Sequence, residues 1–171
     1  MNIDRKLFLM LYNFTQKRVY FNKIVRFIDR ICPIIFAVIF ITLCVYLMFV
    51  GKHMEVLLFI CGPFITLVIC RLVRHLTKRP RPCQMLKINS PHIGKTSYSF
   101  PSNHAASAAA IAFACMLTCV PIGAALLFLA AVTALSRVFT GAHYLSDILG
   151  GFAVAAIVIA ISFWIFKITV G

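Results

Sequence analysis

Five apolar segments constrain the fold of this chain more than any other feature of its sequence. A helix needs about 17–25 residues to cross the hydrocarbon core of a bilayer. Segments near that length cover residues 31–50, 55–75, 104–120, 123–140 and 147–167. Because 62% of the residues are hydrophobic and only 12% are charged, against about a quarter charged in soluble domains, we predict an all-α integral membrane bundle of about five transmembrane helices.

The length of 171 residues predicts a single domain, residues 1–171, with two parts. Residues 31–167 form the catalytic helical bundle, and residues 1–30 form an N-terminal interfacial arm. In the arm, apolar residues recur with the spacing of one helical face, as in an amphipathic helix at the membrane surface. These apolar positions are Phe21, Ile24, Val25 and Ile28. The alternative is a short sixth span, because residues 7–12 are apolar as well.

The charge balance restricts the partners. Seventeen Lys and Arg against four acids give a net charge of +13, which favours anionic partners. The high hydrophobic content argues against nucleic acid and leaves lipid headgroups and phosphorylated substrates of the bilayer. The seven cysteines form no Cys-x-x-Cys pair and the histidines no cluster, so we expect no metal site. Nothing in the sequence predicts the oligomeric state.

One long polar segment, residues 77–103, interrupts the apolar pattern between the second and third predicted spans. With five spans, an even number of crossings separates this loop from the arm and from the turn at residues 140–147. We therefore expect all three to lie on one face of the membrane. His53 and His92 lie in no motif, and we interpret both as interfacial or solvated.

The first polar motif is Arg74-x6-Arg81-Pro82. A guanidinium group carries forked donors that match phosphate oxygens, so Arg74 and Arg81 are candidates for a phosphate clamp. Lys78 and Arg79, between them, are additional candidates. The alternative is a solvated basic loop with no ligand.

The second motif is Pro101-Ser102-Asn103-His104. Ser102 is a candidate N-cap, and the free N–H groups of a helix beginning there would bind an anion. His104, in the first turn, could then donate a proton to a leaving oxygen as general acid. The alternative is a capping serine followed by an interfacial histidine.

The third motif is Ser136-Arg137-x5-His143-x3-Asp147. Arg137 is a third candidate for the phosphate clamp. If one helix covers His143 and Asp147, their spacing of four residues puts them on the same face, where the carboxylate accepts one imidazole N–H. The other imidazole nitrogen is then unprotonated and can act as a nucleophile or base. We predict that this pair carries the chemistry.

These three motifs resemble the signature of the phosphatidic acid phosphatase type 2 superfamily, which reads Lys-x6-Arg-Pro, Pro-Ser-Gly-His and Ser-Arg-x5-His-x3-Asp. The superfamily includes lipid phosphatases and bacterial undecaprenyl pyrophosphate phosphatases. The resemblance covers most of the chain beyond the arm, and the third motif matches at every fixed position. Two positions depart from it: Arg74 replaces the usual Lys and Asn103 the usual Gly.

The resemblance implies a role for each motif residue. His143 would attack phosphorus to form a phosphohistidine, Asp147 would orient it, and His104 would protonate the leaving group. The chemistry would need no metal and no cofactor. The phosphate-binding residues would be Arg74, Arg81, Ser102, Asn103, Ser136 and Arg137.

The expected function is therefore a metal-independent lipid phosphate or pyrophosphate phosphatase, with undecaprenyl pyrophosphate as the first candidate substrate. Phosphatidylglycerol phosphate and phosphatidic acid are the alternatives. Another class is a non-catalytic lipid-phosphate binding or transport protein, and a third is a membrane phosphotransferase or a haloperoxidase-like enzyme.

Two arguments conflict over orientation in the cell membrane. Lys52 and Lys167 are the only basic residues expected on the opposite face, chain termini aside, so the positive-inside rule puts the active site in the cytoplasm. The resemblance implies the extracytoplasmic side, and that is our prediction. Gly150 and Gly151 predict close helix packing beside the site.

Overall fold

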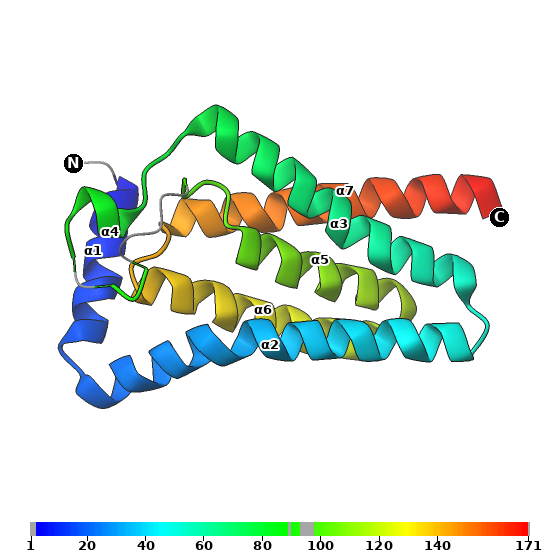
Figure 1. Ribbon diagram of the computed structural model, residues 1–171, viewed down its shortest axis with the longest axis horizontal. Coiled ribbons are helices and arrows are strands. Elements are labelled where there is room, and N and C mark those ends of the chain that lie inside the picture. The colour runs from blue at the N-terminus through cyan, green and yellow to red at the C-terminus, as the bar shows by residue number, and fades with distance from the viewer. Residues whose placement is uncertain (1–2, 89, 93–97, 171) are drawn as a thin grey trace.

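The computed structural model describes residues 3–88, 90–92 and 98–170, and over these residues it is helical, without a strand. This confirms the predicted all-α fold. The helices are α1 (Ile3–Gln16), α2 (Val19–Phe49), α3 (His53–Thr77), α4 (Pro82–Met85), α5 (Asn103–Thr118), α6 (Val120–Phe139) and α7 (Leu145–Val170). The five longer helices after α1 run lengthwise, whereas α1 and α4 lie together at one end (Figure 1).

Four helices, α2, α3, α6 and α7, are long and apolar enough to cross a membrane. Their outer faces carry large exposed apolar side chains, among them Phe49, Phe64 and Trp164, which suits contact with lipid rather than water. These features define a multi-pass membrane protein.

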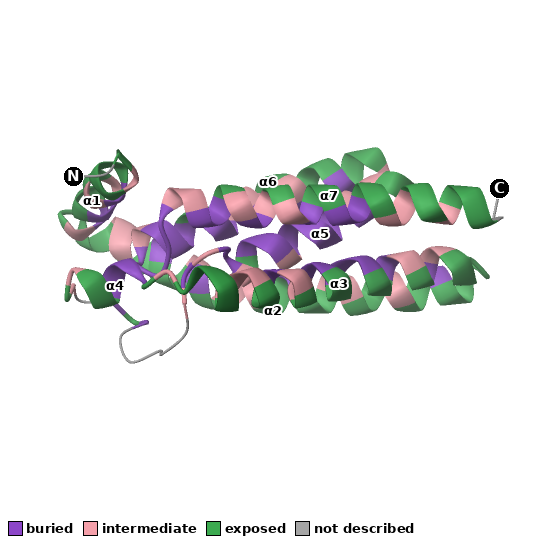
Figure 2. Ribbon diagram, turned by 90° about the horizontal axis from the view of Figure 1, so that it is seen from above, coloured by how far each residue is buried: buried purple, intermediate pink, exposed green. Residues whose placement is uncertain are grey.

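Helix α5 differs from the other four. It has 16 residues and so spans about 24 Å at 1.5 Å per residue, less than the ~30 Å hydrocarbon core. It packs against α3, α6 and α7, and most of its residues are buried in the centre of the bundle (Figure 2). Its alanine-rich sequence permits this close packing. The predicted third span is thus a short central helix surrounded by longer ones.

The N-terminal region is divided differently from the prediction. Helix α2 begins at Val19 and continues to Phe49, so residues 19–30 are the first turns of the first long helix and not part of a separate arm. Helix α1 lies across the end of the bundle (Figure 1), which does not match the alternative of a sixth span. It is held there by buried Phe8, whose ring meets the edge of Tyr144 at a centroid distance of 5.5 Å.

Close packing at Gly151 brings α7 against the beginning of α5. A Cβ atom at Gly151 would lie 2.8 Å from the carbonyl oxygen of Ser102 and 3.2 Å from the amide nitrogen of Ala106. Only glycine allows this approach, which confirms the packing predicted for this position. The predicted common face is also observed, because α1, the polar loop and the turn before α7 gather at the same end (Figure 1).

Candidate active site

Hydrogen bonds to backbone carbonyl groups join the three sequence motifs at this end of the bundle. The guanidinium Nη2 of Arg74 donates to the carbonyl oxygen of Pro101 at 2.6 Å. The N–H of Ser102 in turn donates to the carbonyl oxygen of Asp147 at 2.9 Å. The first motif is thereby fixed to the second, and the second to the third.

The beginning of α5 has the geometry predicted for the second motif. Ser102 is the N-cap, fully buried, and its hydroxyl oxygen accepts the N–H of Ala105 at 3.4 Å. Asn103 is the first residue of the helix. The N–H groups of this first turn, together with the positive end of the helix dipole, favour a bound anion.

His143 and Asp147 form a buried pair, but one helix does not cover both. His143 lies in the turn after Gly141, whose φ of +83° favours glycine, and α7 begins only at Leu145. The pairing comes instead from the start of α7: Asp147 Oδ2 accepts the N–H of Tyr144 at 2.8 Å and lies 3.4 Å from His143 Nδ1. The latter contact does not have the geometry of a formed hydrogen bond. The two side chains therefore lie close together without being hydrogen-bonded.

Burial gives His143 the protonation state that nucleophilic chemistry requires. Its side chain is 2% exposed. Burial lowers the pKa of His143 to about 4, against the opposing effect of Asp147, and the charges of Arg81 and Arg74 act in the same direction as burial. The imidazole is therefore neutral near pH 7. Because Nδ1 faces Asp147, Nε2 is the nitrogen left for chemistry.

Arg79, predicted as an additional phosphate contact, is paired with two carboxylates. Its Nη1 pairs with Asp147 Oδ1 at 2.8 Å and its Nη2 with Asp4 Oδ2 at 2.6 Å. Two carboxylates thus share its charge. Lys78, the other additional candidate, ends α3 in a left-handed conformation with φ of +47° and is exposed.

Ser136 and Arg137 belong to a neighbouring cluster around Asp29. The Nε of Arg137 lies 3.0 Å from Asp29 Oδ1, and the Ser136 hydroxyl lies 3.5 Å from the same oxygen. His92 Nε2 is 3.0 Å from Asp29 Oδ2. The prediction that His92 is interfacial or solvated is therefore wrong, since its side chain is buried against a carboxylate and an arginine.

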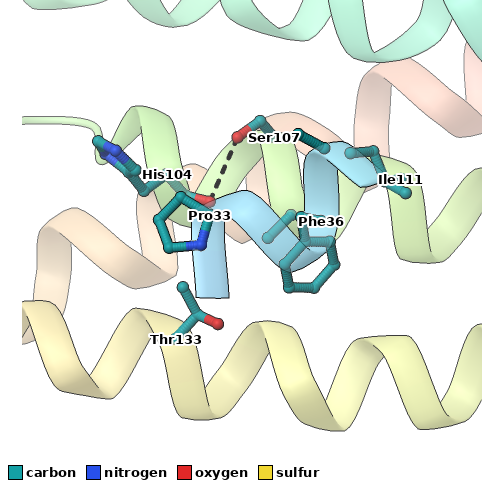
Figure 3. Close-up of a pocket in the computed structure, with 8 residues that line it drawn as sticks. Pro33, Phe36, His104, Ser107, Ile111 and Thr133 are labelled. Atoms are coloured by element: carbon teal, nitrogen blue, oxygen red, sulfur yellow. Dashed lines mark hydrogen bonds between the residues drawn. The ribbon is translucent and has the colours of Figure 1, made fainter. Parts of the chain in front are cut away.

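His104 is the second residue of α5 and is exposed. It lines a mostly apolar cavity of about 170 Å³ between α2, α5 and α6, and its ring lies at the edge of the lining side chains, pointing away from Phe36 and Ile111 (Figure 3). The residues around it include Pro33, Phe36 and Ile111. A leaving group with an apolar tail would fit against these walls.

The buried polar atoms that lack a hydrogen bond coincide with the predicted site. In the described part of the chain, the buried side-chain nitrogen and oxygen atoms without a hydrogen-bond partner are four in number. They are Arg74 Nε, Asn103 Oδ1, Arg137 Nε and His143 Nδ1. Two of these atoms, Arg137 Nε and His143 Nδ1, face a carboxylate in an ion pair. Because buried polar groups in folded proteins are nearly always satisfied, the other two, Arg74 Nε and Asn103 Oδ1, indicate a place for a polar ligand.

Sequence reasoning missed three residues of these clusters: Asp4, Asp29 and His92. A usable signal existed, because the chain has only four acids among seventeen Lys and Arg. In so basic a chain, an acid in an interfacial helix has many possible cationic partners. A buried acid must be paired with one of them. Because acids are so scarce in this chain, those at positions 4 and 29 indicated structural or functional ion pairs.

Comparisons with known proteins agree with this geometry. The family model of the PAP2 superfamily matches residues 55–169. No curated protein matches the sequence. Among solved structures, a transmembrane PAP2-type phosphatidylglycerolphosphate phosphatase from Bacillus subtilis is 18% identical, with a TM-score of 0.75 over 97% of this chain and 85% of its own. LpxE from Aquifex aeolicus is 20% identical, with a TM-score of 0.77 over 96% of each chain.

The family match covers more than half of the chain and includes all three motifs. The two structural likenesses extend the common fold to the N-terminal helices that the family match leaves out. The chain belongs to the PAP2 superfamily of membrane phosphatases.

Proposed function

We propose that this protein removes a phosphate group from a lipid phosphate or pyrophosphate through a phosphohistidine on His143. The observation that carries the proposal is the buried, neutral imidazole of His143 beside Asp147 and near two arginines. Such an imidazole is a nucleophile without further activation. The surrounding cations neutralise the charge of a transferring phosphoryl group.

The proposed reaction has two steps. In the first, Nε2 of His143 attacks the terminal phosphorus, and the bond from phosphorus to the leaving oxygen breaks. That oxygen is the lipid oxygen of a monophosphate or the bridging oxygen of a pyrophosphate, and His104 gives its proton to it. In the second, water attacks the phosphohistidine, the N–P bond breaks, and His104 accepts the proton released by the water. Inorganic phosphate leaves and His143 returns to its starting form. No metal or cofactor enters either step.

The proposed phosphate ligands come from the three motifs. Arg74 and Arg81 act on His143 electrostatically and can hold oxygens of the transferring group. The N–H groups at the beginning of α5, after the Ser102 cap, supply further donors. Asn103, Ser136 and Arg137 stay predicted ligands; Ser136 and Arg137 would have to exchange contacts with Asp29 for contacts with phosphate.

A second cavity, which is basic, supports a pyrophosphate substrate over a monophosphate substrate. It has a volume of about 370 Å³, and its lining includes Arg26, Arg30 and Arg137 against the single carboxylate of Asp29. Pro33 lines both this cavity and the apolar one beside His104. A lipid whose tail occupies the apolar cavity would thus have a cationic site for a second phosphate nearby. This favours undecaprenyl pyrophosphate over phosphatidylglycerol phosphate or phosphatidic acid.

The decisive experiment is phosphate release by purified protein in detergent, with chelator present, from polyprenyl pyrophosphate, phosphatidylglycerol phosphate and phosphatidic acid. We expect release from at least one lipid, loss of it in His143→Ala, and no loss in His53→Ala, a control at an exposed histidine at the other end of the bundle. Binding without release would instead favour a lipid-phosphate binding or transport protein.

The preference for pyrophosphate has its own test. Polyprenyl monophosphate and pyrophosphate of equal tail length are compared in the parent and in the double variant Arg26→Gln, Arg30→Gln. We expect the variant to lose activity on the pyrophosphate selectively, while the exposed control Lys23→Gln changes neither rate. Equal losses on both lipids would remove the second-phosphate site from the proposal.

We further propose that the active site faces the extracytoplasmic side of the cell membrane. The test is a cysteine introduced at Lys87, in the polar loop, and labelled in intact cells with a membrane-impermeant maleimide. The parent chain controls for its seven native cysteines. Labelling only after the cells are lysed would place the site in the cytoplasm.

A further inference from the structure

The N-terminal helix reaches the catalytic pair through a continuous series of polar contacts. Asp4, in the first turn of α1, pairs with Arg79 Nη2 through Oδ2, and Arg79 Nη1 pairs with Asp147 Oδ1. Ser146 joins the same network: Arg79 Nη1 donates to its hydroxyl at 2.6 Å, and that hydroxyl donates to Asp4 Oδ2. Its N–H donates to Asp4 Oδ1 at 3.3 Å.

Exposure changes along this series from surface to interior. The side chains of Asp4 and Arg79 are 21% and 30% exposed, and that of Asp147 is 0% exposed. A fully buried carboxylate needs a fixed cation to stay ionised, and Arg79 supplies it. A partly exposed arginine keeps considerable rotamer freedom, so a further contact is needed to fix its guanidinium group.

Two features restrain Arg79 besides Asp4, Ser146 and Asp147. Its carbonyl oxygen accepts the N–H of Ser99 at 2.7 Å, which fixes the backbone, and its guanidinium lies 4.2 Å from the ring centroid of Tyr144. Neither contact selects the direction of the Nη atoms. Burial raises the pKa of Asp4, but hydrogen bonds from Ser146 and Arg79 outweigh this and lower the pKa overall. Asp4 is therefore an ionised carboxylate that orients the guanidinium group of Arg79.

We propose that Asp4 is a positioning residue for catalysis. It acts through Arg79 to hold Asp147 with Oδ1 bound to Arg79 and Oδ2 turned to His143. The inference rests on the proposed phosphatase function and goes beyond it, because it makes α1, which lies outside the family match at residues 55–169, a part of the catalytic apparatus.

The network also explains the position of Arg79. Its side chain is neutralised by two carboxylates, so its role is to support Asp147 rather than to bind the phosphate. The phosphate clamp is left to the arginines near His143.

The test is a double-mutant cycle with Asp4→Asn and Arg79→Gln, read as kcat and KM for lipid phosphate release. Asp4→Asn keeps the size of the side chain and removes the charge that aligns Arg79. We expect it to lower kcat about 10- to 100-fold, the range seen when groups that orient catalytic ligands are lost, with KM changed less than about threefold. In the Arg79→Gln background, Asp4→Asn should have no further effect on kcat, because the route to Asp147 is already broken.

Two controls separate positioning from folding. Phe8→Leu weakens the packing of α1 on Tyr144 but removes no polar group of the network and keeps an apolar side chain against that ring, so it should lower thermal stability in detergent and leave kcat within about twofold. Glu55→Gln removes an acid in an exposed pair with Lys52 and should change neither quantity. Asp4→Glu, which keeps the charge, should recover part of the lost kcat.

The outcomes are distinct. Unchanged kcat in Asp4→Asn, or losses that multiply independently in the double variant, would overturn the positioning role while the phosphatase function stands. A loss of kcat in Phe8→Leu equal to that in Asp4→Asn would reduce Asp4 to an anchor of α1. A parent protein that releases phosphate from none of the lipids would overturn the proposed function and this inference together.

Discussion

The protein contains two clusters of the same composition that are arranged for different tasks. In each, a buried aspartate lies between an arginine and a histidine: Asp147 between Arg79 and His143, and Asp29 between Arg137 and His92. In the Asp29 cluster, His92 commits its Nε2 to the carboxylate at 3.0 Å. In the Asp147 cluster, Nδ1 faces the carboxylate and Nε2 is left for a substrate.

The two histidines therefore differ in whether Nε2 faces the carboxylate, as in His92, or can attack phosphorus in the proposed reaction, as in His143. Burial and an acidic neighbour are common to both histidines. The differences are which ring nitrogen faces the carboxylate and whether phosphate-binding groups surround the other one. Identifying a nucleophile therefore requires the orientation of the ring, and not only its pairing.

The largest expected difference between the clusters is in their histidines. His143→Ala should lower kcat by at least about 10⁴-fold, the scale of losing a nucleophile, whereas His92→Ala should lower it by no more than about tenfold. Phosphate release measured at equal amounts of folded protein checks this. Similar losses in the two variants would mean that the Asp29 cluster takes part in the chemistry.

Substitution of the two aspartates should affect activity and stability differently. Asp147→Asn should lower kcat by about 10³- to 10⁴-fold, because the imidazole loses the carboxylate that orients it. Asp29→Asn leaves the buried Arg137 without its counter-ion and should cost about 3 kcal/mol of stability, with the smaller effect on kcat. Phosphate release and thermal unfolding in detergent, measured on both variants, test this reversal of order.

The packing beside the catalytic cluster should matter less than its charges. Gly151→Ala places a methyl group against the backbone at Ser102, which cannot move without shifting the beginning of α5. We expect kcat to fall about tenfold, equivalent to about 1.4 kcal/mol. Gly62→Ala is the matched control, because its methyl group would meet only the flexible end of Ile159; an equal loss there would argue against a local effect at the site.

The smallest effect concerns pH. Because the pKa of His143 is lowered to about 4, its neutral form persists from pH 8 down to about pH 5 and is lost only as the pH falls through the lowered value. The imidazole signals of His143 in protein with ¹⁵N-labelled histidine, assigned by comparison with His143→Ala, should therefore not titrate between pH 5 and 8. N-acetylhistidine should titrate near pH 6.5. NMR spectroscopy in detergent gives the measurement, and a titration of the His143 signals near pH 6.5 would contradict the lowered pKa.

The sequence predicted the bundle well because apolar length is a direct consequence of bilayer thickness. It missed the junction of arm and first span, since the amphipathic pattern of residues 19–30 and the uniform apolar pattern that follows belong to one continuous helix. A change of periodicity marks a change of environment along a helix as readily as its end.

The proposed catalytic residues could be predicted for a similar reason, whereas the residues that support them could not. Motif spacing identified His143 and Asp147, but a pairing such as Asp4 with Arg79 joins residues 75 positions apart. No local pattern encodes it, because it arises only when α1 crosses the end of the bundle. The same holds for His92 and Asp29, which come from a loop and a helix 63 positions apart.

The apolar cavity beside His104 has a kinetic consequence. Its walls come from α2 and α6, which are long enough to span the membrane, and from the central helix α5, so a substrate tail lodged there stays within the plane of the bilayer. Encounters are then two-dimensional. The variable that governs the rate is the mole fraction of substrate among the surrounding lipids, and a Michaelis constant for this protein has physical meaning only when expressed on that surface scale.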